Sequence, residues 1–130
     1  MHKGITLTAA ILIVIGVILG AFGAHSLKPL LSEEQLLSYE TGVRYQLIHG
    51  VAMLALGVAQ KQIPFRLTWS YRLLLFGTIL FSGSIYFLSL QPVLGAKLSF
   101  LGPITPIGGT LLIAGWIVFI VNVLKSKGKE

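Results

Sequence analysis

Tyr45, Gln46 and His49 are the residues of this 130-residue chain whose types and spacing come closest to a chemical site. They lie in an apolar stretch, and an ionisable side chain at membrane depth is costly enough that it usually has a partner or a task. Helical spacing would place Tyr45 and His49 on one face, with Gln46 one residue round. An imidazole there could handle a proton, hold a small polar ligand, or ligate a metal or haem iron.

Further titratable residues could join His49 from the neighbouring segments. His25 follows the first apolar stretch and would reach the same side of the membrane if the first two spans are antiparallel neighbours. Glu40 lies four residues before Arg44, the favourable order for a pair along a helix. The candidate polar cluster comprises His25, Glu40, Arg44, Tyr45, Gln46 and His49. Hydrogen bonding between helices is the favoured interpretation, and ligand or proton handling and metal or haem ligation remain open.

Catalytic and metal-binding motifs are missing from the sequence. The chain has no cysteine, which excludes disulfides, thiolate metal sites and cysteine nucleophiles. Gly-x-Ser-x-Gly, His-Glu-x-x-His and phosphate-loop patterns are also absent. The histidines lack a carboxylate or third imidazole at ligand spacing, since His2 falls on the opposite side. We therefore expect no catalytic residue, no metal and no cofactor, and a protein that is not an enzyme.

The composition is that of a membrane protein. Hydrophobic residues make up 55% of the chain and charged residues only 11%, against about 25% charged residues in soluble domains. The net charge of +6 comes from basic residues scattered between apolar segments and at the C-terminus. Because no nucleic-acid-binding module accompanies them, they are better explained as cationic flanks of membrane spans. Nucleic acid is therefore not an expected partner.

Four apolar stretches are long enough to cross a bilayer, which takes about 20 residues per helix. The sequence therefore predicts a single transmembrane domain over residues 1–130, folded as an all-α, integral membrane four-helix bundle. Its spans are expected at about residues 5–25, 43–60, 70–90 and 104–124. The first stretch could pass for a secretory signal. It is longer than a usual signal core and three more spans follow, so we interpret it as a retained helix.

The positions of the basic residues predict the orientation. Seven lie at the N-terminus, in the second loop or at the C-terminus: Lys3, Lys61, Arg66, Arg72, Lys125, Lys127 and Lys129. Only Lys28, Arg44 and Lys97 lie in the first and third loops, so the positive-inside rule places both termini in the cytoplasm. In the first external loop, Ser32 to Gln35 form a capping-box pattern, which predicts a short amphipathic interfacial helix at about residues 32–42 that bends into the second span near Gly42.

Glycine and proline mark the remaining patterns. Gly16, Gly20 and Ala24 recur at four-residue spacing, and the third span carries Gly77, Ser82, Gly83 and Ser84; small residues at such spacing are typical of helix-packing faces. The fourth span opens with a broken-helix motif whose marked residues are Gly102, Pro103, Thr105, Pro106, Gly108 and Gly109. We interpret this motif as a structural turn, with part of a pocket near His25 and His49 as the alternative.

The chain resembles the domain of unknown function 423 family, small four-pass membrane proteins found widely in bacteria with a eukaryotic branch. The resemblance rests on Gly-Ala-Phe-Gly-Ala-His25, on Tyr45-Gln46 with His49, and on the run from Gly102 to Gly109. These motifs are spread over three of the four spans, and the family pattern covers nearly the whole chain. The family's activity is unassigned, so the resemblance implies a fold and a set of candidate positions.

Three functions remain open. The favoured one is a non-enzymatic bundle in the cell (inner) membrane that binds or supports other membrane components, with the lipid bilayer, a second copy of the chain or other membrane proteins as partners. The second is a small transporter or proton-linked carrier with a polar site around His25 and His49, although all four acidic residues lie outside the apolar spans. The third is a haem- or quinone-binding membrane subunit.

Overall fold

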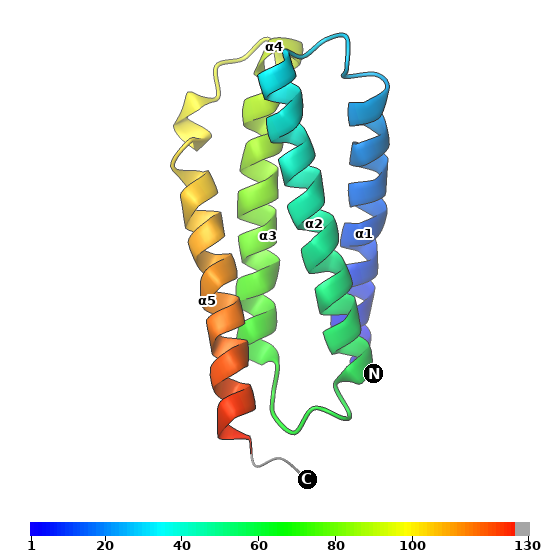
Figure 1. The fold of residues 1–130 in the computed structure, drawn as a ribbon, viewed down its shortest axis with the longest axis vertical. Coiled ribbons are helices and arrows are strands. Elements are labelled where there is room, and N and C mark those ends of the chain that lie inside the picture. Colours follow the sequence, from blue (N-terminus) through cyan, green and yellow to red (C-terminus); the bar gives the residue numbers. More distant parts are fainter. Residues whose placement is uncertain (127–130) are drawn as a thin grey trace.

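The computed structural model describes residues 1–126, in which four long helices run side by side with alternating direction (Figure 1). The long helices are α1 (Lys3–Ala24), α2 (Glu33–Ala59), α3 (Thr68–Ser89) and α5 (Ile104–Lys125). Two short helices, α4 (Gln91–Leu94) and η1 (Ser99–Leu101), lie in the loop between α3 and α5. All four long helices are long and apolar enough to cross a membrane, which confirms the all-α fold with four spans.

The second span is longer than its apolar stretch. The predicted capping box is present: Gln35 N donates to Ser32 Oγ at 3.2 Å, and Ser32 N donates to Gln35 Oε1 at 3.0 Å. The helix then continues without interruption to Ala59, so residues 33–42 are its first turns and do not form a separate helix. Contacts made by Tyr39 with α1 and by Gly42 with α3 hold this part in line with the rest. Where the membrane boundary crosses α2 stays a prediction.

The helices pack in chain order and leave the bundle open on one side. The extensive interfaces join α1 to α2, α2 to α3, and α3 to α5. Figure 1 shows α1 and α5 at opposite sides of the molecule, separated by α2 and α3. One buried cluster passes through all four helices: Ala9, Met53, Leu74 and Leu112. The outer faces of α1 and α5 carry exposed side chains such as Val14 and Ile120, as expected for surfaces that face lipid tails.

Small residues lie where the helices approach most closely. A Cβ added to Gly16 would lie 2.7 Å from the Leu47 side chain of α2. The small-residue packing face predicted for α1 continues from Gly16 through Gly20 to Gly23, which is buried. Ala24, which was predicted to belong to this face, is exposed. Between α3 and α5, a Cβ on Gly108 would overlap the backbone of Phe81. The predicted packing role is therefore confirmed for Gly16, Gly20 and Gly77, with Gly23 in place of Ala24, and it is wrong for Gly83, where an added Cβ would meet nothing within 4 Å.

The two ends of the bundle differ in what they carry. Lys3 at the start of α1 and Lys125 at the end of α5 lie at the same end (Figure 1), as an even number of spans requires. The opposite end holds a second buried cluster around Leu31, Tyr39 and Val43. Which end faces the cytoplasm stays a prediction, and Lys127 and Lys129, which contributed to it, lie outside the described residues.

Replacing Gly108 by Ala should destabilise the protein. The added methyl group must push α5 away from the α3 backbone, and overpacking of this kind costs about 1–3 kcal/mol. Thermal or denaturant unfolding in detergent would measure the loss. Gly83→Ala in α3 is the matched control, because its Cβ would meet nothing within 4 Å; it should be neutral or gain up to about 1 kcal/mol from helix propensity. Equal stability of the two variants would contradict the close approach.

Candidate functional site

His49 lies in the middle of α2 and is 6% exposed. Its Nδ1 lies 2.8 Å from the carbonyl oxygen of Tyr45 one turn earlier. Because a carbonyl oxygen can only accept, Nδ1 must carry the proton. On the other side of the ring, Trp116 Nε1 of α5 donates to His49 Nε2 at 3.1 Å. Both ring nitrogens are therefore engaged, and their partners assign a neutral imidazole with its proton on Nδ1.

The bond from Trp116 links two helices that are not adjacent in the bundle. The interface between α2 and α5 is minor because α3 separates most of their lengths. The indole of Trp116 reaches across this separation, and its ring centre lies 6.1 Å from that of His49. An indole N–H at membrane depth needs an acceptor, and His49 supplies it. His49 thus has a structural task, which agrees with the favoured interpretation of the sequence.

A groove opens beside this hydrogen bond. It has a volume of about 430 Å³ and is lined by Tyr45, His49, Phe81, Gly109, Leu112, Ile113 and Trp116, which we name the His49 groove. The Tyr45 ring lies 4.7 Å from that of Phe81 and stacks at 6.1 Å on that of His49. Ile113 is 63% exposed at the rim. Rings from α2, α3 and α5 thus form the walls of a groove that opens on the lipid-facing surface.

Gln46 performs a different task on the neighbouring part of α2. Its Nε2 donates to the carbonyl oxygen of Leu12 in α1 at 2.8 Å, and its Oε1 accepts from the Tyr86 hydroxyl of α3 at 2.7 Å. The side chain is buried. One amide therefore joins three helices and satisfies the half-buried phenol of Tyr86, so we assign Gln46 to the framework and not to the groove.

The other members of the candidate cluster do not gather around His49. His25, Glu40 and Arg44 are all exposed. Gly50, next to His49, lies against Ile13 of α1, and His25 ends α1 roughly 18 Å further along the helix at about 1.5 Å per residue. The two imidazoles are therefore not placed to share one ligand. Within residues 1–126, no group of three or more histidine, aspartate or glutamate residues is placed to hold a metal ion.

The broken-helix motif forms a turn followed directly by α5. Gly102 and Pro103 precede the helix, with Pro103 as its N-cap, while Thr105 and Pro106 lie in the first turn. The Thr105 hydroxyl is 2.7 Å from that of Ser84 in α3. Gly108 packs on the α3 backbone as described above, and only Gly109 lines the His49 groove. The motif is thus mainly structural, and one of its glycines leaves space beside the aromatic rings.

Sequence reasoning missed Trp116 and Phe81, which complete the site. Both lie in spans whose apolar pattern gives no reason to choose one aromatic residue over another. A signal was nevertheless present, because Trp116 is the one tryptophan inside an apolar stretch, whereas Trp69 lies at the start of α3. Its N–H had to find an acceptor at membrane depth, and few side chains in the spans could provide one.

Comparison with known proteins fixes the family. The model of the family described as protein of unknown function (DUF423) matches residues 19–109. The chain belongs to the DUF423 family. This confirms the resemblance drawn from the motifs around His25, His49 and Gly102 to Gly109, all of which lie within the matched region.

Relatives in the DUF423 family are membrane proteins of similar length. A UPF0382 membrane protein of Staphylococcus epidermidis is 42% identical over 109 residues, covering 84% of this chain and 85% of the relative. The UPF0382 inner membrane protein YgdD of Escherichia coli is 40% identical over 122 residues, covering 93% of this chain and 89% of the relative. No solved structure matches significantly. This DUF423 chain is accordingly a multi-pass protein of the cell membrane.

Replacing His49 should separate the hydrogen-bonding role from other roles. His49→Ala leaves the Trp116 N–H without its acceptor and should lower the free energy of unfolding by about 1 kcal/mol or more. His49→Gln offers both a donor and an acceptor, so it should retain most of the stability. Trp116→Phe is the control: in that background, the difference between the Ala and Gln variants should shrink. Equal stability of all His49 variants in detergent would contradict the role.

Gln46 and Tyr86 should behave as a coupled pair. Gln46→Leu leaves the Tyr86 hydroxyl unsatisfied, whereas Tyr86→Phe removes that hydroxyl and should lessen the cost of Gln46→Leu. Interhelical hydrogen bonds in membrane proteins average about 0.6 kcal/mol and reach about 1.7 kcal/mol. A double-mutant cycle measured by unfolding in detergent should therefore give a coupling energy in this range. Additive single and double variants would show that the two side chains do not interact.

Proposed function

We propose that this DUF423 protein is a non-enzymatic membrane protein that binds a hydrophobic component of the bilayer in the His49 groove. The observation that carries the proposal is the set of rings lining the groove: Tyr45, His49, Phe81 and Trp116. Pockets for small hydrophobic molecules are typically concave, mostly apolar and lined by aromatic side chains, with few polar groups. A lipid chain is the occupant best suited to such a groove at membrane depth.

The accessibility of the groove supports this proposal. Tyr45 is 39% exposed and Ile113 is 63% exposed, so a molecule diffusing in the bilayer would reach the groove from the side. Gly109 carries no side chain into it. A ligand could therefore enter without passing through water, which suits a component that stays dissolved in the membrane.

The state of His49 supports a binding role over a chemical one. Its Nδ1 donates to Tyr45 O and its Nε2 accepts from Trp116. A proton-linked carrier that used His49 would have to break one of these bonds in each cycle, and haem ligation through Nε2 would have to displace the indole. Both alternatives are therefore less well supported than binding beside an intact hydrogen bond.

A quinone is the second candidate occupant, favoured by the rings of the groove. Aromatic rings pair at centre separations of about 4.5–7 Å, and the planar head of a quinone could lie against Tyr45 or Trp116. The Tyr45 hydroxyl belongs to a partly exposed side chain that lines the groove, and it could donate to a quinone carbonyl. This candidate differs from a lipid chain in requiring that hydroxyl.

Trp116 can report on its own groove. Trp69→Phe leaves Trp116 as the single tryptophan. Titrating this variant in detergent with a phospholipid brominated on its chains should quench the fluorescence of Trp116 and saturate at an equimolar ratio. Gly109→Leu should weaken the binding by about tenfold, because a leucine side chain would fill the groove. Its Cβ lies 3.6 Å from the Phe81 ring, an ordinary contact, so the helices can stay packed.

Two comparisons complete the test. Unsaturable quenching, equal in the parent and the Gly109→Leu variant, would mean general lipid contact and would overturn the proposal. A short-chain quinone should quench more strongly than the brominated lipid if the second candidate is right, and Tyr45→Phe should then weaken only the quinone. Ile120→Ala on the lipid-exposed surface of α5 is the control for general changes in that helix and should leave binding unchanged.

A further inference from the structure

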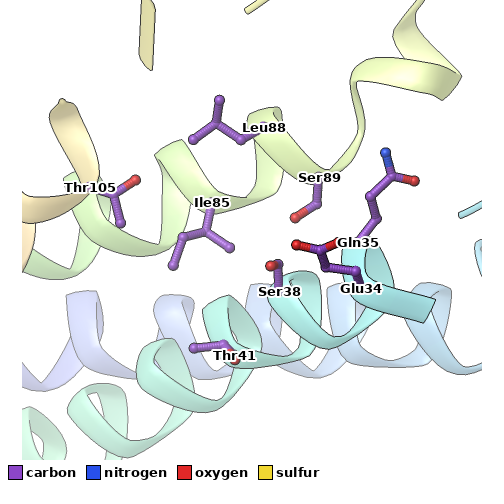
Figure 2. Close-up of a pocket in the computed structure, with 8 residues that line it drawn as sticks. All are labelled: Glu34, Gln35, Ser38, Thr41, Ile85, Leu88, Ser89 and Thr105. Atoms are coloured by element: carbon purple, nitrogen blue, oxygen red, sulfur yellow. The ribbon is translucent and has the colours of Figure 1, made fainter. Parts of the chain in front are cut away.

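A second cavity lies at the opposite end of the bundle from Lys3 and Lys125. It has a volume of about 410 Å³ and is lined by Glu34, Gln35, Ser38, Thr41, Ile85, Leu88, Ser89 and Thr105, which we name the Glu34 cavity (Figure 2). The first turns of α2 form one wall and the last turns of α3 form the other. It shares no lining residue with the His49 groove, so it requires its own explanation.

Ser89 is the residue that points to a ligand. It is only 3% exposed, and its Oγ has no hydrogen-bond partner within the described part of the chain. Serine and threonine in membrane helices commonly donate to the carbonyl one turn earlier, as Thr78 does to Leu74 O at 2.7 Å. Ser89 makes no such bond. A buried hydroxyl without a partner costs about 1–3 kcal/mol, a cost that a ligand would remove.

The polar groups of the cavity converge on one region. Figure 2 shows the hydroxyl of Ser89 directed toward the space into which the carboxylate of Glu34 and the hydroxyl of Ser38 also project. The amide of Gln35 points away from this space, in keeping with its bond to Ser32 in the capping box. The convergent set is therefore one carboxylate and two hydroxyls.

The chemistry of this set fits a primary ammonium group. Glu34 is the only charged residue that lines the cavity, and an ionised carboxylate only accepts hydrogen bonds. Hydroxyl oxygens of Ser38 and Ser89 add two further acceptors. An ammonium group carries three donors and one positive charge, which would match the three acceptors and neutralise the carboxylate. A free phosphate or another anion that carries no ammonium group would be repelled by Glu34.

The rest of the lining indicates that the ligand also has an apolar part. Ile85 of α3 projects toward α2 beside the polar groups (Figure 2), and Leu88 also lines the cavity. The cavity lies where α2 begins and α3 ends, which is the level of the head groups for helices that span the hydrocarbon. The polar head of an amphiphile would therefore contact the polar lining of the cavity, and its apolar part would contact the apolar lining.

We propose that the Glu34 cavity binds a primary ammonium group carried by an amphiphile, with an aminophospholipid head group as the ligand class. Glu34 neutralises the charge, and Ser38 and Ser89 accept the remaining N–H donors. This proposal is independent of the function proposed for the His49 groove, because it concerns other residues at another depth. A soluble primary amine has the same ammonium group, so the test includes it as a separate source.

The test compares head groups of equal charge but different donor number. The purified protein in detergent receives either phosphatidylethanolamine or phosphatidylcholine with the same chains, and binding is followed by native mass spectrometry and by the melting temperature. The ethanolamine lipid should bind about tenfold or more tightly, since a quaternary ammonium has no N–H to donate. Equal binding of the two lipids would overturn the proposal. Competition by free ethanolamine would support the same ammonium site with a soluble source.

Variants of α2 and α3 make the test specific. Glu34→Gln should weaken binding of the ethanolamine lipid by about tenfold. Glu33→Gln is the matched control, because it removes the same charge from the same first turn of α2, and Glu33 does not line the cavity. Ser89→Ala should weaken binding several-fold yet leave the lipid-free protein as stable as the parent or more stable. Equal effects of Glu34→Gln and Glu33→Gln would overturn the assignment, and Gly109→Leu should leave this binding unchanged.

Discussion

The fold depends on how helices hold together when lipid surrounds them. Lipid tails are as apolar as the side chains that face them, so burial against a neighbouring helix brings little hydrophobic gain. Close backbone contact and hydrogen bonds must supply the attraction. Gly108 permits close backbone contact between α3 and α5. Tyr39 of α2 provides a hydrogen bond by donating to Leu19 O of α1 at 2.6 Å. Each extensive interface of this protein contains close backbone contact, an interhelical hydrogen bond, or both.

The polar side chains within the spans follow from the same constraint. Ser82 donates to Gly42 O at 2.7 Å between α3 and α2, and Gln46 and His49 each engage a partner on another helix. Such residues are costly at membrane depth unless every donor and acceptor is used. Within residues 1–126, two buried hydroxyls lack a partner, those of Ser70 and Ser89, and only Ser89 lines the Glu34 cavity. The contrast is what separates the Glu34 cavity from the polar framework.

Much of the architecture could be predicted because it is encoded locally. Apolar length places the four spans, and the Ser32 capping box sets the first residue of α2. The small-residue faces were also predictable, because their spacing is a property of single helices. The continuity of α2 through Gly42 could not be predicted, because contacts with α1 and α3 decide whether the helix bends at this glycine.

The candidate site could be predicted only in part. Tyr45 and His49 share a helix face, so their proximity followed from spacing alone. The hydrogen-bond partner of His49 could not be predicted from spacing, because Trp116 lies 67 residues further along the chain. Its position near His49 depends on how α5 packs on α3. The separation of His25 from His49, about 18 Å along the helices, was not predictable for a related reason: adjacency of two helices does not fix the level at which their residues lie.

The serial arrangement of the helices has a consequence for how the protein is made. Each extensive interface joins spans that are neighbours in the sequence, so contacts are nearly as local as a four-span fold permits. Each span after the first therefore finds a packing partner already in the membrane when it leaves the ribosome. Chains with such local contacts fold quickly. The bond from Trp116 to His49 is the exception, and it would close last, fastening the finished fourth helix to the second.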